Sequence, residues 1–427
     1  MSSVQGQQGD AGEPDARRAE HLEQIGRTDD ALTAYRAALA VDPTNADLLR
    51  RLAHCQMRSE KEAEQALVTI GQAVALVPND PYNHVVRSLV LAEQRKSKFA
   101  VAAAEEAIAL EPELSLGHSA LANAYMKRQS WHAAEVSAKK ALSLQPDEEM
   151  AANILAHALF CQGKQVENQV HISNLLHQDP EDPYTHYAAG LAALQAEQYQ
   201  KAEEHFLEAL RLNPNFDAAR EGLLHAFRAR SIIYRSYLRY GFFMTRLTSG
   251  QRFGLIIGLL LGVQLLRGVL RNVSPGISTG IGVVYLLFVV WTFVAKSVGS
   301  LIVLGDRKAR RALRLIDRVD AVVVGGGVVV GLVSLVAGFV TGQSTLIALG
   351  GGCICMAVPV GMALTNDHPK GKYLYGLLGV INVIVLLVMI VSLVVPGLEL
   401  MVFASATGFL TLIVTTWLAV FGVLYRN

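Results

Sequence analysis

The chain is poor in the residues that enzymes and secreted proteins depend on. Its four cysteines follow no disulfide-framework spacing, which is typical of a reducing compartment. The first forty residues lack a charged start followed by an apolar run, so no cleavable signal peptide is predicted. No phosphate-binding glycine loop and no metal-spaced set of cysteine and histidine occurs, and we therefore expect no cofactor and no metal site.

Acidic residues are scarce in the second half of the chain. Residues 228–427 hold five acids against 18 lysines and arginines, whereas residues 1–227 hold 32 acids against 20. The five acids fall in loops or at the borders of apolar runs, so no intramembrane protease site can be assembled from them. Nucleic-acid binding is excluded because the half able to form a soluble groove is acidic. The chain is therefore predicted not to be an enzyme.

Long apolar runs dominate residues 253–427. A helix needs about 20 apolar residues to cross a bilayer. Basic residues gather in alternate loops, above all at 228–252 and 305–320, and this bias places those loops and both termini in the cytoplasm. The alternation favours six spans, with five as the alternative. The expected spans are 253–270, 279–304, 321–340, 345–364, 373–395 and 400–424.

The stretch from Arg228 to Arg252 holds six arginines and no acid, interleaved with aromatic residues. Arginines pair with anionic headgroups and amphipathic rings favour the headgroup level, so the stretch predicts a helix at the cytoplasmic membrane interface. A basic face on an ordinary soluble helix is the alternative. The predicted interface residues are Arg235, Tyr237, Arg239, Tyr240, Phe243 and Arg246.

The first half of the chain is repetitive. Prolines recur at 43, 78, 112, 146, 180 and 214, and each follows an apolar helix end such as AVALVP or ALRLNP. A period of 34 residues is the length of a helix–turn–helix repeat, and a proline cannot extend the helix before it. The spacing therefore predicts six repeats between about residues 12 and 214.

These repeats resemble the tetratricopeptide repeat family. That family places a small residue, an aromatic four positions later and a second small residue before the proline. The sets Ala31–Tyr35–Ala38–Pro43 and Ala202–Phe206–Ala209–Pro214 match fully, while the repeat ending at Pro180 is degenerate. The whole chain looks like bacterial integral membrane proteins with an N-terminal tetratricopeptide domain. This resemblance implies an all-α superhelix whose first helices line a concave face.

The resemblance also implies which residues face that groove. The predicted partner-binding set is rich in aromatic, amide and methionine side chains, as peptide-binding surfaces tend to be. Packing between repeats is the alternative role for each of them. The set consists of Tyr82, Asn123, Met126, Asn153, His157, Phe160, Tyr184 and Tyr187. Histidines at the fourth repeat position, His84, His118 and His186, are expected to pack between helices.

The sequence thus predicts an all-α chain in four parts. These are a disordered N-terminus (1–11), a tetratricopeptide superhelix (12–227), a basic aromatic juxtamembrane helix (228–252) and a six-helix transmembrane domain (253–427). The function hypothesis is an adaptor that binds a peptide or partner protein at a bacterial inner membrane with anionic headgroups. The rival hypothesis is a channel or transporter subunit that the repeat domain regulates. Self-association, or membership of a larger membrane complex, is left open.

Overall fold

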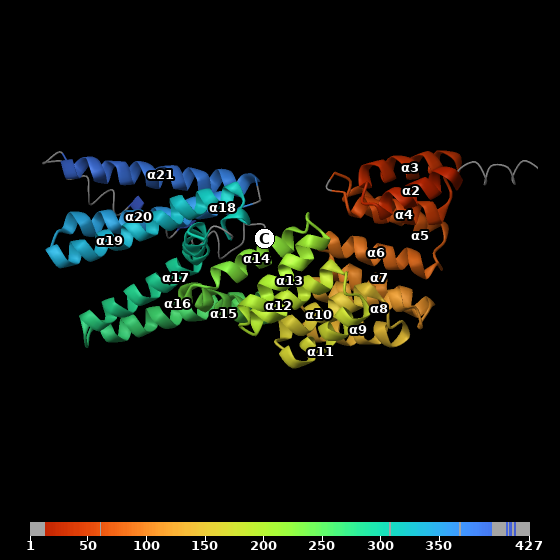
Figure 1. Ribbon diagram of the computed structural model, residues 1–427, viewed down its shortest axis with the longest axis horizontal. Coiled ribbons are helices and arrows are strands. Elements are labelled where there is room, and N and C mark those ends of the chain that lie inside the picture. Colours follow the sequence, from red (N-terminus) through yellow and green to blue (C-terminus); the bar gives the residue numbers. More distant parts are fainter. Residues whose placement is uncertain are drawn as a thin grey trace, which may run out of the picture. The chain divides into compact units, whose positions relative to one another are not determined.

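The computed structural model describes residues 13–394 except 60, 307–308 and 367–368, together with 407–408, 410–411 and 414–415. The predicted disordered segment 1–11 and most of the predicted sixth span, 400–424, lie outside these residues. All elements in the described part are helices, which confirms the all-α prediction (Figure 1). They divide between Ala188 and Ala189 into two compact units.

The first unit is built from antiparallel helix pairs, each pair being one repeat. In chain order the helices are α2 (Glu13–Gln24), α3 (Thr28–Val41), α4 (Ala46–Met57), α5 (Gln65–Leu76), α6 (Pro81–Glu93), α7 (Ser97–Leu110), α8 (Ser115–Lys127), α9 (Trp131–Leu144), α10 (Glu149–Gln162) and α11 (Gln165–Gln178). The sixth pair, α12 (Pro183–Gln195) and α13 (Tyr199–Leu212), begins at the unit boundary and is followed by α14 (Asp217–Arg228). The prediction of six repeats and a capping helix is confirmed.

A left-handed residue separates the two helices of five repeats. These residues have φ between 60° and 76°, and the last four of them are 34 residues apart: Gly26, Arg95, Gln129, Gly163 and Glu197. A left-handed residue ends a helix by turning the chain back on itself. The turn between the two helices of a repeat therefore recurs at the same 34-residue spacing as the proline between successive repeats.

Alanines make the helix packing of the first unit close. In α7 and α9 the small repeat positions are all 0% exposed: Ala100, Ala104, Ala107, Ala134, Ala138 and Ala141. The repeated histidines hold the outer turns, since each donates through Nε2 to the carbonyl of the proline six residues earlier. The distances are 2.7 Å for His84 and 3.1 Å for both His118 and His186.

The second unit contains the long apolar helices. After α15 (Ile232–Arg246) come α16 (Ser249–Arg271), α17 (Pro275–Leu304), a short turn at Ala309–Arg311, α18 (Leu315–Asp320), a π-helical turn (Ala321–Gly325), α19 (Gly326–Thr341), α20 (Ser344–Thr365) and α21 (Pro369–Val394). Five stretches in the described part are long and apolar enough to cross a membrane: Gly250–Arg271, Pro275–Leu304, Leu315–Thr341, Ser344–Thr365 and Lys370–Val388.

The helical turn α18 shortens the loop predicted at 305–320. It begins at Leu315 and runs on through the π-helical turn into α19, so Asp317 and Asp320 lie on a helix and are 6% and 3% exposed. The preceding helix α17 has 30 residues. At 1.5 Å per residue that is about 45 Å, longer than a hydrocarbon core of about 30 Å. One end of α17 therefore extends beyond any hydrocarbon layer that it crosses.

Candidate functional site

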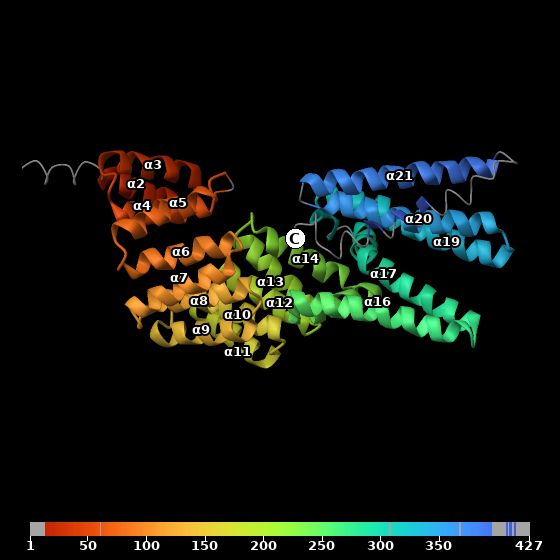
Figure 2. The same cartoon turned by 180° about the vertical axis from the view of Figure 1, so that it is seen from behind.

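The first helix of each repeat is predicted to line the groove. The helices α4, α6, α8 and α10 contact one another in succession, and Figure 2 shows the helices from α6 to α10 following one another along the array. Several first helices are held at their start by a side-chain cap. Examples are Asn45, whose side chain accepts from the Leu48 amide at 3.1 Å, and Asp80, which accepts from the Tyr82 amide at 2.9 Å.

The predicted groove residues are distributed over four of these first helices. Tyr82 on α6 and Tyr184 on α12 are 39% and 53% exposed. Those on α8, together with Asn153 and Tyr187, are half-buried. Phe160 is 7% exposed, and its ring lies 6.4 Å from that of His157, so it supports the neighbouring ring more than it offers surface of its own.

His157 occupies the most distinctive environment of this set. Its side chain is exposed on α10, yet the surrounding helices displace enough water to lower the pKa of the imidazole, and Lys127 lowers this pKa further. The ring is therefore neutral at pH 7 and offers one donor and one acceptor. Burial likewise raises the pKa of Tyr187, which keeps its hydroxyl protonated.

The predicted membrane-interface residues lie on α15, and most of them have partners within the protein. Tyr237 and Tyr240 set their rings edge-on to Trp291 of α17, at 6.1 Å and 5.9 Å. Arg239 forms two hydrogen bonds with Glu197, at 2.8 Å and 2.7 Å. Arg235 donates to the Ala229 carbonyl at 2.8 Å and lies 5.0 Å from the centre of the Tyr199 ring. Phe243, which is 49% exposed, and the exposed Arg246 remain on the surface.

The family comparison decides what the repeats are. Models of the tetratricopeptide repeat match residues 24–85 and 183–216. These ranges fall on the first repeats and on the sixth repeat of the structure. These stretches of the chain are tetratricopeptide repeats. No curated protein matches it.

Solved structures of other tetratricopeptide proteins resemble the chain over about half its length. The Pseudomonas aeruginosa protein pilF is 21% identical over 50% of this chain and 97% of its own, with a TM-score of 0.39. YrrB, described as having an unusual peptide-binding site, is 21% identical over 44% of this chain and 96% of its own, at 0.32. The type IV pilus biogenesis factor PilW is 16% identical over 50% and 98%, at 0.42.

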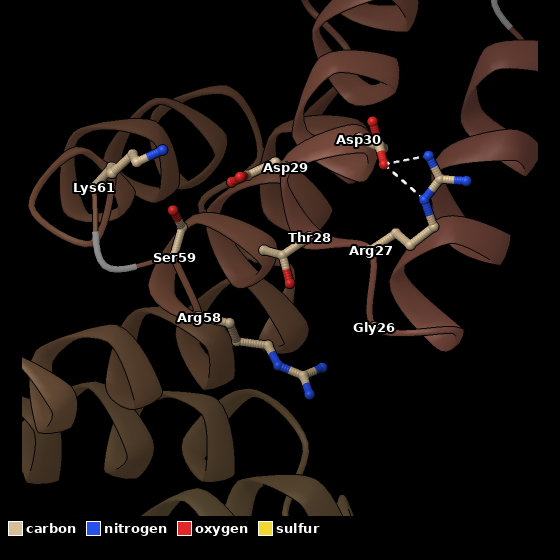
Figure 3. Close-up of a pocket in the computed structure, with 8 residues that line it drawn as sticks. All are labelled: Gly26, Arg27, Thr28, Asp29, Asp30, Arg58, Ser59 and Lys61. Atoms are coloured by element: carbon tan, nitrogen blue, oxygen red, sulfur yellow. Dashed lines mark hydrogen bonds and ion pairs between the residues drawn. The ribbon is translucent and has the colours of Figure 1, made fainter. Parts of the chain in front are cut away.

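Outside the groove, the tetratricopeptide array has an open depression of about 450 Å³ at its first turn. Figure 3 shows its lining side chains, in which Arg27 donates to Asp30 at 2.7 Å. Acidic and basic groups are mixed there, and Figure 3 marks no interaction among the labelled side chains besides the Arg27–Asp30 pair. Across the described residues, no three histidine, cysteine or acidic side chains lie close enough to hold a metal ion. A second, apolar depression of about 680 Å³ lies between α16 and α17.

One group of buried polar residues was not predicted from the sequence. Arg228 is 0% exposed and contacts α17 and α18, whereas the sequence predicts it to begin a stretch at the membrane interface. A signal was present on the apolar helix α17, where Lys296, Ser297 and Ser300 stand within one helical turn of each other. Polar residues at that spacing share one face, and such a face needs polar neighbours.

Proposed function

We propose that this tetratricopeptide-repeat protein is a membrane-anchored adaptor, whose array binds a peptide or partner protein beside the bilayer. The observation that carries the proposal is the surface of the first helices α6, α8, α10 and α12. It exposes tyrosine rings at Tyr82 and Tyr184, with a neutral imidazole and half-buried amides between them. Aromatic side chains contribute large contact areas to binding surfaces at low entropic cost.

The polar groups of this face suit an extended peptide. Asn123 on α8 and Asn153 on α10 each offer an amide with two donors and a carbonyl acceptor. The same pattern of donor and acceptor occurs along a peptide backbone, so such side chains hold the main chain while the tyrosines receive side chains. The array therefore selects a segment by its apolar or aromatic residues more than by its charge.

The apolar helices of the second unit support the anchoring part of the proposal. Five stretches of 19 to 30 residues have the length and hydropathy of membrane spans. Phe243 and Arg246 lie near the end of α15, just before α16, and both side chains are exposed. We place them at the anionic headgroups of a bacterial inner membrane, with the array on the cytoplasmic side.

A channel or transporter subunit is the second candidate, because Asp317 and Asp320 are buried in the candidate span Leu315–Thr341. Acids within spans often mark ion pathways. Both aspartates, however, belong to the first turns of that stretch, and Asp317 lies 3.5 Å from Arg314 and 3.9 Å from Arg228. Paired charges at the end of a span favour a structural role, so we keep the adaptor as the proposed function.

The test compares two triple variants of the full-length protein, each extracted from its native membrane. The groove variant carries Asn153→Ala, Tyr184→Ala and Tyr187→Ala. The control carries Val68→Ala, Val136→Ala and Val170→Ala, three side chains of one repeat position that are 54–58% exposed on the second helices. We expect the groove variant alone to lose its co-purified partner, by at least about tenfold, because aromatic hot-spot residues each contribute about 2 kcal/mol or more. Equal recovery from both variants would refute the groove.

A further inference from the structure

Arg228, the last residue of the capping helix α14, is the largest fully buried side chain of the described residues. Its Nε donates to the hydroxyl of Ser300 on α17 at 2.9 Å. Its Nη2 lies 3.9 Å from a carboxylate oxygen of Asp317 on α18. Within the described part of the chain, neither Nη1 nor Nη2 makes a hydrogen bond of good geometry. A complete guanidinium is thus enclosed among three helices with one hydrogen bond.

Charged residues of both signs surround this arginine. On α14, Glu221 lies 3.0 Å from Arg314 and 3.7 Å from Lys296. Burial alone would raise the pKa of Glu221, but the charges of Lys296, Arg228 and Arg314 together hold it below its ordinary value. The cluster contains three cations and three acids, so its charges balance: Arg228, Lys296, Arg314, Glu221, Asp317 and Asp320.

The helix packing around the cluster is close. At Gly299 of α17, an added Cβ would lie 2.8 Å from Cδ2 of Tyr234 and 3.3 Å from Cβ of Arg228. Tyr234 is 1% exposed and its hydroxyl is 2.7 Å from Nδ1 of His225. Burial and the nearby Arg228 lower the pKa of His225 to about 3, so this ring adds no charge to the cluster. The end of α14 and the start of α15 are therefore fitted to one face of α17.

Holding two helices together with buried charges costs desolvation free energy. Burying an ion pair costs several kcal/mol per ion, and apolar side chains of similar volume often stabilise a fold equally well or better. The cost is recovered only when geometry is good, whereas here the guanidinium and the carboxylate are 3.9 Å apart. A contact of this kind holds while the charges balance and opens when one charge is lost.

We propose that Arg228 is a latch that fastens the capping helix α14 to α17 and α18. While it is seated between Ser300 and Asp317, the end of the tetratricopeptide array moves with the apolar helices. When its charge is not compensated, α14 separates from them. The latch goes beyond the proposed adaptor function and does not depend on what the groove binds. Either proposal can therefore be refuted without affecting the other.

The experiment measures crosslinking between α14 and α17 in the full-length protein, in its native membrane. Glu221→Cys and Lys296→Cys are introduced after the four native cysteines are changed to alanine, and a short bismaleimide joins the two sites. Both side chains are 31% exposed and are separate from the contacts of Arg228 with Ser300 and Asp317, which this background retains. Their removal takes one charge of each sign and leaves the cluster balanced.

Three variants are compared in that background. Arg228→Met leaves two buried acids facing one cation, and we expect crosslinking to fall by about tenfold or more, since an unpaired buried charge strongly destabilises its site. Arg228→Met with Asp317→Asn restores the balance and should recover at least half of the yield. Arg246→Met, which removes an exposed arginine of the same junction, should crosslink like the parent.

Each outcome decides the proposal. Unchanged crosslinking in Arg228→Met would overturn it. If that variant proves to be misfolded by size-exclusion chromatography and thermal unfolding, the balanced double variant decides instead. A folded double variant that does not recover crosslinking would show that Arg228 acts by its shape and not by charge compensation, which also overturns the latch. Recovery in a folded double variant supports it.

Discussion

The two units of this protein bring helices together with different small residues. In the tetratricopeptide array the close contacts are made by alanines such as Ala104 and Ala138, which are 0% exposed. Between α19 and α20 they are made by glycines, and a Cβ on Gly350 would lie 2.6 Å from the backbone oxygen of Gly331. Burying a methyl group from water stabilises a fold, whereas lipid offers no such gain and favours direct backbone contact. The choice of small residue therefore follows the solvent for which each helix is suited.

The units also bury charge differently. Glu135 on α9 is 3% exposed and accepts hydrogen bonds from Lys139, Lys164 and Gln162 at 2.6 to 2.8 Å. Arg228 on α14 is equally buried but makes a single good hydrogen bond. A satisfied buried charge strengthens its surroundings, while an incompletely satisfied one weakens them. We therefore expect the helix packing around Glu135 to be stable, and the packing at the end of α14 to change when a charge near Arg228 is lost.

The largest expected effect is the loss of stability at low pH when Glu135 becomes protonated. Burial opposes ionisation, yet the hydrogen bonds from Lys139, Lys164 and Gln162 lower the pKa of Glu135 from 4.5 to about 2. A lowered acid pKa gives stability that is present above the unfolded value and is lost as the pH falls toward the folded value. We expect about 3 kcal/mol to be lost between pH 4.5 and 2. Thermal unfolding by circular dichroism should show this slope in the parent protein and a flatter one in Glu135→Gln. Equal slopes would remove the contrast with Arg228.

The second prediction tests the glycine contact. In Gly350→Ala the new methyl group would meet the backbone of Gly331 and the amide nitrogen of Leu335, at 2.6 Å and 2.8 Å, and neither can move aside alone. We expect a loss of about 1–3 kcal/mol, as overpacking usually costs. The matched control is Gly351→Ala, whose Cβ would have no neighbour within 4 Å among the described residues. Thermal unfolding in detergent that fails to separate these two variants would contradict the account of α19 and α20.

The third prediction makes the opposite change in the array. Ala138→Gly removes a methyl group that is 0% exposed and adds backbone freedom to α9. Together these effects should cost about 1–2 kcal/mol. The measurement is the urea midpoint of the array's helical signal, with Ala102→Gly, at an exposed position of α7, as a control that lacks the packing loss. A larger loss in the control would mean that helix propensity and not packing sets the value.

The smallest effect is expected at Gly254 of α16. No atom of the described structure would lie within 4 Å of a Cβ there, so Gly254→Ala should change stability by less than about 0.5 kcal/mol. Thermal unfolding next to Gly350→Ala tests this directly. A loss as large as that of Gly350→Ala would mean that α16 has a close neighbour which this single chain does not contain.

The repeat architecture was predictable because its determinants are local. Prolines at a 34-residue spacing end helices, and small residues at fixed positions allow helix contact, so six pairs and a capping helix could be placed from the sequence alone. The partners of the arginines in the stretch Arg228–Arg252 could not be predicted from the sequence. Arg228 bonds to Ser300 across 72 residues of sequence, and Arg239 reaches back to Glu197 across 42. A basic, aromatic stretch has the same composition whether its arginines face headgroups or acids of the same chain.

The groove set was predictable in its repeat positions but not in its exposure. Family geometry places Phe160 and His157 three residues apart on the same face, yet one side chain is buried and the other exposed. Which of two such rings packs inward depends on the neighbouring helices, and this is a property of tertiary packing. Asn123, Asn153 and the two tyrosines of α12 remain predictions until binding is measured.

The adaptor proposal is tested most directly by a photoreactive amino acid placed at His157, in the full-length protein in its native membrane. The control carries the same group at Val136, which is 54% exposed on the second helix α9. We predict one discrete adduct from position 157, none from position 136, and loss of that adduct when Tyr184→Ala and Tyr187→Ala are added. Equal adducts from both positions, or an adduct from position 157 that survives the tyrosine substitutions, would contradict binding in the groove.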